Sequence, residues 1–456
     1  MQISKSVLKF PERVSIAGFI LLIMMGTGLL MLPAAATGNR LGLTDALFTA
    51  TSASCVTGLA VVDTGRDLSI FGQAVLLFLI QTGGLGIMTL STLFLMAAGK
   101  RPGLTGQILI KDSFTHSRER PLSAILRDVF LFVFAIEGAG MVLMFFRFIP
   151  ERELSEAFHL SLFHSVSAFC NAGFSTFPDS FMGYREDWVL NLIISFLIIC
   201  GGIGFPVLSE LKQKQNFPFG RRGRWSLLSL HSKIVISATI ILLFISSVSI
   251  LLMEWNNTLS SLSVSGRFLA AFFQAVSVRT AGFNTLPIGD MANESLFLMM
   301  LLMFIGACPG SCGGGIKITT FVTLVQLGIS RLRGKERPQI FCRTIPRASV
   351  EKAVSVVMIS SLVVTGGSLA LMMTELGETP HPMSRGMFLE LSFDVVSAVG
   401  TVGLSTGVTG KLTVAGKSVI TLMMFMGRLG PLVIAIAVSR QNTSRYYYAE
   451  ENIMVG

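Results

Sequence analysis

A short glycine-centred segment occurs four times in this 456-residue chain, and it constrains the fold more than any other feature. The copies occupy residues 52–59, 167–174, 276–283 and 397–404. Their shared glycines, Gly58, Gly173, Gly282 and Gly403, are 115, 109 and 121 residues apart. A unit that recurs at nearly constant spacing sets the architecture of a chain. We therefore expect four equivalent blocks, each with regular structure interrupted at its glycine.

The composition between these segments is that of a membrane protein. Hydrophobic residues make up 51% of the chain and charged residues only 14%, whereas a soluble domain is roughly a quarter charged. Five histidines and six cysteines are scattered without the spacing of a metal site. They form no catalytic cluster with carboxylates, so we expect no enzyme activity. The net charge of +10 lies in loops between apolar runs and predicts no nucleic-acid partner.

Each block has the same order of apolar runs: a long run, a short run, the glycine segment and a second long run. The runs are residues 14–32, 43–54 and 70–98; 125–149, 155–169 and 189–211; 234–253, 264–278 and 296 onward; and 354–373, 384–399 and 419–438. A helix of about 20 residues spans a bilayer, and one of about 12 does not. The pattern predicts an all-α membrane protein with eight transmembrane helices and four re-entrant pore helices around one central pore. The four repeats are placed at residues 1–123, 124–230, 231–346 and 347–456.

The basic residues favour one side of these helices. Of the 36 lysines and arginines, 24 lie before the first span or around the ends of the blocks, and ten lie on the side of the glycine segments. Because cytoplasmic loops carry an excess of Lys and Arg, we expect both termini in the cytoplasm and the glycine segments open to the outside. The outer side holds more acidic than basic residues, which would concentrate cations there. The first apolar run is also compatible with a signal peptide, but its length of about 19 residues favours a spanning helix.

The glycine segments have the properties of an ion-selectivity filter. Irregular chain at membrane depth survives only inside protein or against a water-filled cavity. Each short helix would point its partly negative C-terminal end at that cavity, where the following carbonyls could replace the water shell of a cation. Glycine permits the backbone angles of such an inward turn. The candidate filter residues are Val56, Thr57, Gly58, Asn171, Ala172, Gly173, Thr280, Ala281, Gly282, Thr401, Val402 and Gly403.

Four such blocks with these segments resemble the Trk/Ktr/HKT superfamily of potassium-translocating proteins over nearly the whole chain. The resemblance is to the KtrB type, because the chain begins directly at the first block and ends about 18 residues after the last span. It implies the potassium-translocating subunit of a sodium-dependent uptake system, a homodimer surrounded by lipid in the bacterial inner membrane.

The same resemblance implies a regulatory partner. KtrB-type subunits assemble on a cytoplasmic ring of KtrA-type RCK proteins, which bind ATP, ADP or NAD(H). This chain would bind no cofactor of its own, only potassium and sodium ions. Its basic loops at residues 107–120 and 331–347 are the candidate docking surface, although such charges also serve to set membrane topology.

A glycine- and proline-rich segment interrupts the last helix of the third block. Residues 306–315 include one proline and five glycines, which cannot continue a helix. The segment begins 24 residues after Gly282, on the cytoplasmic side of the filter. The resemblance implies an intramembrane gating loop, with an arginine of the fourth block positioned to contact it. The candidate gate residues are Ala307, Cys308, Pro309, Gly310, Ser311, Cys312, Gly313, Gly314, Gly315 and Arg428.

Other residues in the apolar runs are expected to serve packing. Glycines at matching places on the second long helices would permit close helix contacts. They are Gly83, Gly84, Gly86, Gly201, Gly202, Gly204, Gly427 and Gly430. Three carboxylates are expected to be structural partners behind the filter: Glu137, Glu390 and Asp394. Lys317 is a second basic candidate near the gate, although we expect it to reach the cytoplasmic interface.

Two further transport classes and an enzyme are the alternatives. A Trk-type transporter would share the same four blocks. An alternating-access cation symporter would show inverted repeats and broken helices that meet at mid-membrane. All four blocks run in the same direction and only one helix is expected to be broken, which disfavours that symporter. A membrane enzyme is disfavoured by the scattered histidines, cysteines and carboxylates.

Overall fold

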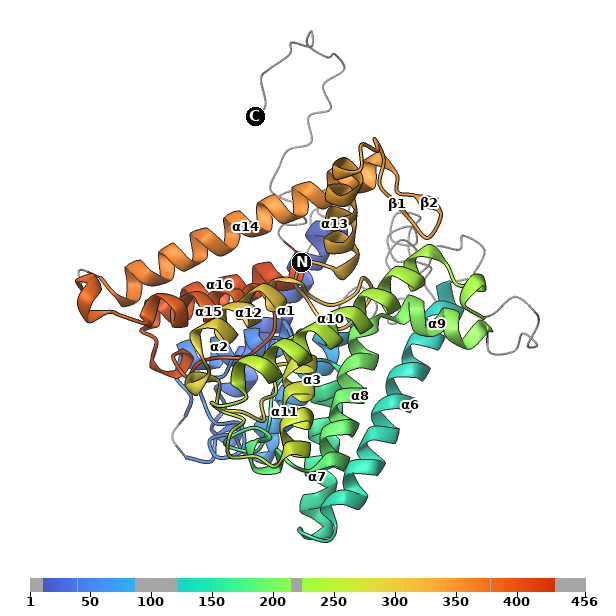
Figure 1. Cartoon of the computed structure of the whole chain (residues 1–456). Helices are drawn as coiled ribbons and strands as arrows, with labels where there is room; N and C mark the ends of the chain where they lie inside the picture. Colours follow the sequence, from blue (N-terminus) through green and yellow to red (C-terminus); the bar gives the residue numbers. More distant parts are fainter. Residues whose placement is uncertain (1–10, 39, 87–121, 215–223, 378, 431–456) are drawn as a thin grey trace, which may run out of the picture.

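The computed structural model describes residues 11–38, 40–86, 122–214, 224–377 and 379–430. These residues form a bundle of helices, and the sheet among them is a hairpin of two short antiparallel strands (Figure 1). The strands are β1, Gln339–Ile340, and β2, Arg343–Thr344. The all-α prediction missed this hairpin, which follows the third block.

The first repeat contains α1 (Pro11–Leu30), the short α2 (Leu43–Ser54) and α3 (Ile70–Leu85). The bounds of α2 are those of its apolar run. Ser69 caps α3, because its side chain accepts a hydrogen bond from the backbone N–H of Gly72. The predicted span 70–98 is described only as far as residue 86, and the candidate docking loop 107–120 lies outside the described residues.

The second repeat contains α6 (Leu122–Phe148), α7 (Leu154–Phe169), α8 (Trp188–Ile203) and α9 (Phe205–Lys214). We predicted one span over residues 189–211 without a break, whereas α8 and α9 meet at a bend of 95°. The bend falls at Gly204, whose φ is +93°. This left-handed conformation suits glycine and cannot continue a right-handed helix.

The third repeat contains α10 (Leu230–Glu254), α11 (Val264–Ser277), α12 (Asn293–Phe304) and α13 (Ile318–Leu332). Between α12 and α13 the chain is non-helical, which confirms the predicted interruption at residues 306–315. We call residues 305–317 the interrupting loop. Together with the bend at Gly204, it gives the described chain two broken helices, so the expectation of a single broken helix is wrong.

The fourth repeat contains α14 (Arg347–Glu375), α15 (Met387–Gly400) and α16 (Val414–Leu429). Residues 431–438 of its predicted last span lie outside the described residues. Short 3₁₀ turns lie between the longer helices of the chain. They are Pro33–Ala35, Met182–Tyr184, Arg224–Leu227, Ile288–Asp290, His381–Met383 and Thr409–Lys411.

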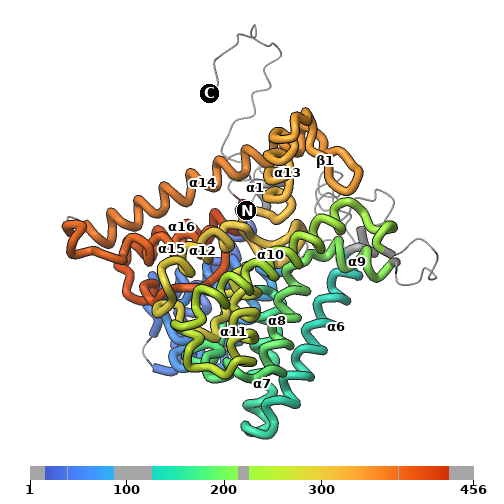
Figure 2. Tube along the Cα trace, viewed as in Figure 1, coloured from blue at the N-terminus to red at the C-terminus, as the bar shows by residue number. Residues whose placement is uncertain are grey.

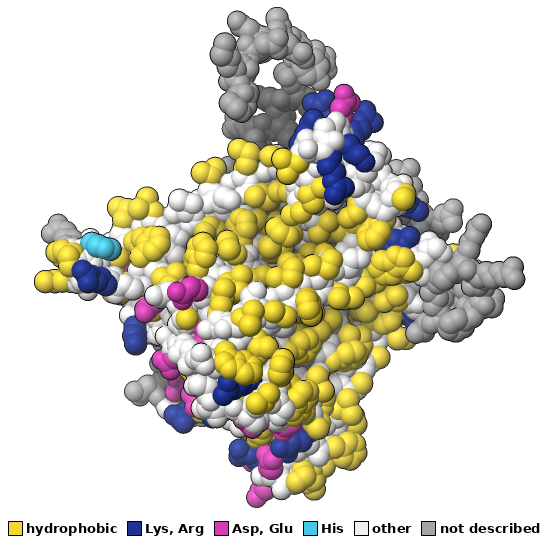
Figure 3. Space-filling view, in the orientation of Figure 1, with side chains coloured by type: hydrophobic (Ala, Val, Ile, Leu, Met, Phe, Trp, Pro, Cys, Tyr) yellow, Lys and Arg dark blue, Asp and Glu magenta, His cyan; other side chains and the backbone are white. Residues whose placement is uncertain are grey.

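Within the described ranges, three helices are long and apolar enough to cross a membrane by length and composition. They are Leu126–Phe148, Leu230–Glu254 and Arg347–Glu375, and the bent pair Trp188–Ile203 with Phe205–Gln213 would be a fourth. The prediction of eight spans therefore stays a prediction. The outer surface fits a membrane, because hydrophobic side chains cover most of the visible face and Lys and Arg gather around α13 and the hairpin (Figure 3).

The four repeats close into a circle through one kind of contact. In each repeat the helix after the glycine segment packs against the short pore helix of the next repeat. The pairs are α3 with α7, α8 with α11, α12 with α15, and α16 with α2. The last pair brings the two ends of the described chain side by side, as the blue and red segments show (Figure 2). This arrangement places the ends of four pore helices around one centre.

Candidate functional site

The same backbone turn follows each of the four pore helices. Two residues before each shared glycine, a residue with a side chain adopts a left-handed φ, which is uncommon outside glycine. These residues are Val56 (φ 56°), Asn171 (58°), Thr280 (68°) and Thr401 (50°). The glycines are also left-handed, at Gly58 (93°), Gly173 (71°), Gly282 (81°) and Gly403 (92°). Strain retained at four equivalent places, in β-branched residues at three of them, points to a function for the turn.

The four glycines lie in a closed ring, which we call the glycine ring. A Cβ atom placed on each glycine would lie within 2.8 Å of the carbonyl oxygen that precedes the next glycine. The contacts are Gly58 with Ala172 (2.5 Å), Gly173 with Ala281 (2.8 Å), Gly282 with Val402 (2.4 Å) and Gly403 with Thr57 (2.2 Å). The last contact joins the fourth repeat to the first. No larger residue fits at these positions without a shift of the neighbouring backbone.

A buried serine near the end of each pore helix holds the turn in place. The hydroxyl oxygens of Ser52 and Ser397 accept hydrogen bonds from the N–H groups of Gly58 (3.1 Å) and Gly403 (3.0 Å). In the other repeats the hydroxyls of Ser167 and Ser277 donate to carbonyls just after the glycine, those of Phe174 and Phe283. Sequence reasoning did not assign these serines a role, although a serine recurs in every copy of the segment.

Small residues let the outer helices approach the ends of the pore helices. A Cβ atom on each of three glycines would overlap a carbonyl oxygen at the end of the pore helix in the same repeat. The pairs are Gly83 with Ser54 (2.0 Å), Gly201 with Phe169 (1.8 Å) and Gly427 with Val399 (2.2 Å). These contacts confirm the prediction that the three glycines serve close helix packing.

The interrupting loop lies against the glycine ring at the face where the pore helices end. The N–H of Gly314 donates a hydrogen bond to the side-chain oxygen of Thr401 at 3.0 Å. A Cβ atom on Gly313 would lie 2.2 Å from the side-chain oxygen of Thr280. Both threonines are the left-handed residues of their turns, so the loop covers two of the four positions around the centre.

The loop is tied to the bent helix of the second repeat. Carbonyl groups at the C-terminal end of a helix have no partner within the helix, and here loop N–H groups bind them. The loop also supplies a carbonyl for the first N–H after the bend. The hydrogen bonds run from Cys308 to Gly202 (3.1 Å), from Cys312 to Gly201 (3.2 Å) and from Phe205 to Gly310 (2.9 Å). The bend of α8 and the course of the loop therefore depend on each other.

Arg428 bonds to the loop from the fourth repeat. Its guanidinium donates hydrogen bonds to the carbonyl oxygen of Cys312 and to that of Gly83 at the end of α3. The positions that match Arg428 in the first two repeats are Gly84 and Gly202. In the fourth repeat an arginine therefore occupies a position that is glycine in the first two repeats. Its side chain connects the loop to the end of α3 in the first repeat.

Lys317 makes a second basic contact with the loop. The expectation that this side chain reaches the cytoplasmic interface stays a prediction. Its Nζ donates to the carbonyl oxygen of Gly313 at 2.8 Å, so it folds back over the loop that precedes it. Lys317 and Arg428 thus bind the carbonyl oxygens of two neighbouring loop residues, Gly313 and Cys312.

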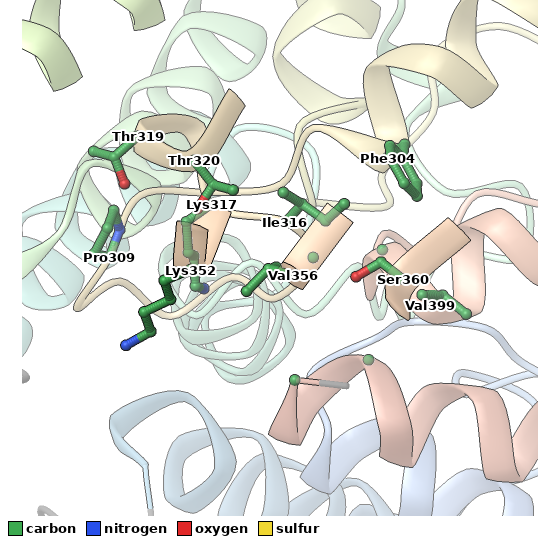
Figure 4. Close-up of a pocket in the computed structure, with 14 residues that line it drawn as sticks. Phe304, Pro309, Ile316, Lys317, Thr319, Thr320, Lys352, Val356, Ser360 and Val399 are labelled. Carbon is green, nitrogen blue, oxygen red and sulfur yellow. The ribbon is translucent and has the colours of Figure 1, made fainter. Parts of the chain in front are cut away.

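A cavity of about 390 Å³ lies beside the interrupting loop (Figure 4). Pro309 and Ile316 of the loop line it on one side, and Lys352, Val356 and Ser360 of α14 line the other. Interiors of folded proteins are close-packed, so an opening of this size gives the loop space into which it can move.

The remaining candidate side chains lie outside the ring. Glu137 is buried on α6 and accepts a hydrogen bond from Gln81 of α3 at 3.2 Å, as expected of a structural partner. The thiol of Cys170 lies 3.8 Å from the same carboxylate. Among the described residues there is no group of three or more His, Cys, Asp or Glu side chains that could hold a metal ion.

These features define a helical membrane protein with four inward turns around one centre and a loop across one face. The chain belongs to the TrkH family of cation transport proteins, which it matches over residues 11–447. It is similar to the Ktr system potassium uptake protein B of Bacillus subtilis, with 40% identity over 98% of this chain and 97% of the relative. The protein of the same name from Vibrio alginolyticus is 36% identical, over 97% and 94% of the two chains.

Two further comparisons agree with this family. The potassium/sodium uptake protein NtpJ of Enterococcus hirae is 35% identical over 98% of this chain and 97% of the relative. The crystal structure of the potassium transporter TrkH from Vibrio parahaemolyticus superposes with a TM-score of 0.70, covering 93% of this chain and 85% of that one. Its sequence identity is 22%, so it supports the fold. The sequence resemblance to the Trk/Ktr superfamily is confirmed.

Proposed function

We propose that this chain is the potassium-translocating membrane subunit of a Ktr-type uptake system. The observation that carries the proposal is the closed glycine ring, in which four repeats contribute the same left-handed turn. Relatives at 36% and 40% identity that span nearly the whole chain are named potassium uptake proteins. Cation transport requires no catalytic residues, so the proposal assigns no enzyme activity to this chain.

The filter is assigned to the residues at and just before each ring glycine. Their carbonyl oxygens follow helices α2, α7, α11 and α15, whose partly negative C-terminal ends meet around one centre. A dehydrated cation at this centre would receive main-chain oxygens from four sides in place of water. The left-handed turns support this assignment, because their strain has no evident use in packing alone.

The gate is assigned to residues 307–315 together with Arg428. In the observed conformation Gly313 and Gly314 lie against two threonines of the filter turns, where they would stop an ion from leaving toward the cytoplasm. Arg428 and Lys317 hold this conformation through loop carbonyls. Opening would move the loop toward the cavity beside α14, and the small side chains of the loop permit such a movement.

The wider system is part of the proposal. We place both termini in the cytoplasm of a bacterium, with the chain in the inner membrane as a homodimer among lipids. Uptake is proposed to depend on sodium, which fits the name of the relative NtpJ, a potassium/sodium uptake protein. A KtrA-type ring that binds ATP, ADP or NAD(H) would dock on basic residues of segment 331–347. Arg333, Arg337 and Arg343 are exposed there.

An alternating-access symporter is the second candidate, because one observation favours it. The described chain has two broken helices in adjacent repeats, and their ends are hydrogen-bonded to each other. The closed ring argues against this class. All four repeats share one centre and contact their neighbours in the same way, whereas alternating access needs two halves that move against each other.

The proposed function is tested by uptake of potassium or rubidium in a bacterium that lacks its own potassium uptake systems. Cells that express the chain with its regulatory partner should grow at low potassium, and sodium should raise the rate of uptake. Cells with the empty vector and cells that express the partner alone are the controls. Growth and rubidium uptake no better than in those controls would contradict potassium transport. Saturable uptake whose reversal potential follows the potassium and sodium gradients together in a fixed ratio would favour the symporter.

A further inference from the structure

Arg279 is a cation with few partners beside the third filter turn. It directly precedes Thr280, the left-handed residue of that turn, and is half-buried. Its guanidinium has five N–H donors, but its hydrogen bond to the hydroxyl of Thr239 on α10 is long, at 3.5 Å. Its Nε is buried and has no hydrogen-bond partner. Among the ion pairs of the described residues, none includes Arg279.

The other three repeats have no cation at this position. Counted back from the ring glycine, its equivalents are Cys55, Cys170 and Gly400. Three repeats therefore complete the turn without a charge. An arginine whose donors are largely unused is costly to keep inside a protein, so its presence in the third repeat calls for an explanation other than the shape of the turn.

Arg279 lies where the interrupting loop meets the end of α8. Helices α8, α10 and α11 pack against one another at this place (Figure 1). A cavity of about 10 Å³ is lined by Arg279, by Gly202 at the end of α8 and by Ala307 of the loop, and the thiol of Cys308 faces the guanidinium. The carbonyl oxygen of Gly202 accepts a hydrogen bond from the N–H of Cys308 at 3.1 Å. In this conformation the loop, and not the arginine, is the partner of that carbonyl.

An equivalent carbonyl in the first repeat is bound by an arginine. Gly83 on α3 and Gly201 on α8 occupy matching places, because each packs against the end of the pore helix in its own repeat. The carbonyl oxygen of Gly83 accepts from the guanidinium of Arg428, whereas that of Gly201 accepts from the N–H of Cys312 at 3.2 Å. A guanidinium suits this place, because its charge favours the partly negative C-terminal end of a helix. An arginine can therefore replace loop N–H groups there.

Any movement of the loop away from the ring releases the end of α8. The carbonyl groups of Gly201 and Gly202 then lose the N–H groups of Cys312 and Cys308. Carbonyl groups without partners are costly inside a membrane protein. Arg279 does not leave with the loop, because it belongs to the filter turn and follows the end of α11 directly.

We propose that Arg279 stabilises the open gate by binding the carbonyl groups at the end of α8 when the loop leaves them. Its first acceptor is Gly202, which lines the same cavity. Movement of Ala307 opens this cavity on the loop side and gives the guanidinium room to reach the carbonyl. The two arginines of the gate thus act in opposite directions, since Arg428 holds the closed loop through Cys312. Arg279 acts through α8 and is a positioning residue.

This inference rests on the proposed function, in which the loop is the gate. Arg279 raises the fraction of open gates and leaves the ring that selects the ion unchanged. Loss of Arg279 should therefore lower the maximal rate of uptake and not the affinity for the ion. A role in the filter would change the affinity, and a role in folding would lower the stability of the protein.

The transport test measures rubidium uptake in cells that express the chain with its regulatory partner, at equal amounts of the chain in the membrane. Arg279→Met removes the charge and the donors at similar length. Its maximal uptake should fall about tenfold or more, as expected for the loss of charge-assisted hydrogen bonds in the open state. The rubidium concentration for half-maximal uptake should not change. Arg279→Lys keeps the charge and three donors, so its loss should be smaller.

Two outcomes of this measurement would overturn the proposal. Maximal uptake in Arg279→Met that equals that of the parent would show that the open gate does not need the arginine. A higher uptake by this variant without the regulatory partner would instead make Arg279 part of the closed latch.

Thermal unfolding of the purified full-length chain distinguishes this role from a structural one. The closed conformation uses few donors of Arg279, so Arg279→Met should unfold at the temperature of the parent or above it. If Arg279→Met does not fold, Arg279→Lys carries both measurements. A lower unfolding temperature in both variants would show that the arginine supports the fold, and would overturn the proposal.

Arg267 on the same helix is the matched control, because it has the partners that Arg279 lacks. Its guanidinium binds the carbonyl oxygens of Trp255, Ser260 and Leu262 and lies 4.6 Å from the ring centre of Trp255. Arg267→Met should therefore lower the unfolding temperature. It should leave the maximal uptake unchanged when uptake is compared at equal amounts of folded protein.

A double variant separates the inference from the proposed function. Arg428→Gln weakens the closed loop and should raise uptake without the partner, and addition of Arg279→Met should reverse most of that rise. A rise that persists in the double variant would overturn the role of Arg279 and leave the gate assignment in place. Absence of rubidium uptake by the parent would contradict the proposed function, and the inference would fall with it.

Discussion

The glycine ring and the residues that lie just beneath it differ in symmetry. In the ring, four repeats with different sequences converge on one backbone conformation, and each contacts its neighbour in the same way. In the layer beneath, the equivalent positions are not all alike. The first and second repeats have Gly84 and Gly202, the third has the interrupting loop, and the fourth has Arg428.

The difference fits the roles that we propose for the two layers. An ion on the central axis gains most when oxygens surround it evenly, so coordination favours four copies of one turn. A barrier needs only one element that crosses the axis, with space left for it. The loop binds the carbonyls of Gly201 and Gly202 through its N–H groups, and Arg428 holds the loop through the carbonyl of Cys312. Under the proposed function, the symmetric ring would coordinate the ion and the asymmetric layer would control its passage.

The largest effect is expected in the ring. Gly403→Ser places a side chain at φ +92°, with its Cβ 2.2 Å from the carbonyl oxygen of Thr57, so it should reduce rubidium uptake to the level of cells without the protein. A tenfold loss corresponds to only about 1.4 kcal/mol. Gly386→Ser is the matched control, since Gly386 has a φ of +88° and open space around its Cβ position. Equal losses in both variants would show that backbone strain, and not closure of the ring, is responsible.

An intermediate effect of opposite sign is expected beneath the ring. Arg428→Gln removes charge-assisted hydrogen bonds to the carbonyls of Cys312 and Gly83, each worth about 1.5–3 kcal/mol. The closed loop should lose stability, and uptake without the regulatory partner should rise roughly tenfold. Arg385→Gln, an exposed arginine of the same repeat, should leave uptake unchanged. Deletion of residues 311–314 should act in the same direction, and unchanged uptake in both variants would remove the gate assignment.

The smallest effect is expected where the two layers meet. Thr401→Val deletes the oxygen that accepts the Gly314 N–H at 3.0 Å and leaves the filter carbonyls in place. One neutral hydrogen bond contributes about 1 kcal/mol, so basal uptake should rise by about threefold or less. Thr401→Ser keeps the acceptor and should behave as the parent. A loss of potassium selectivity in Thr401→Val, measured against sodium in flux assays, would instead assign the side chain to the filter.

Local patterns predicted many of the individual elements. The bounds of α2 follow from its apolar run, and the break before α13 follows from five glycines and a proline. The packing role of Gly83, Gly201 and Gly427 followed from their matching places in the repeats. Each of these features depends on residues close together in the chain, where propensity and periodicity operate.

The features that the sequence did not reveal depend on contacts between distant residues. The bend at Gly204 is stabilised by the hydrogen bond of Phe205 with Gly310, more than 100 residues away. Lys317 turns onto Gly313 because its own loop folds back, and Arg428 reaches Gly83 across 345 residues of sequence. A glycine that permits a bend does not require one, so the same motif could have continued as a straight helix.

By itself, the sequence determined a membrane protein of four repeats, each with a turn centred on a glycine, because hydropathy and steric freedom are properties of short segments. Only the tertiary structure decided that the four glycines meet in a closed ring and which groups cover it. Those outcomes depend on which surfaces pack together, and a chain's local pattern does not contain that information.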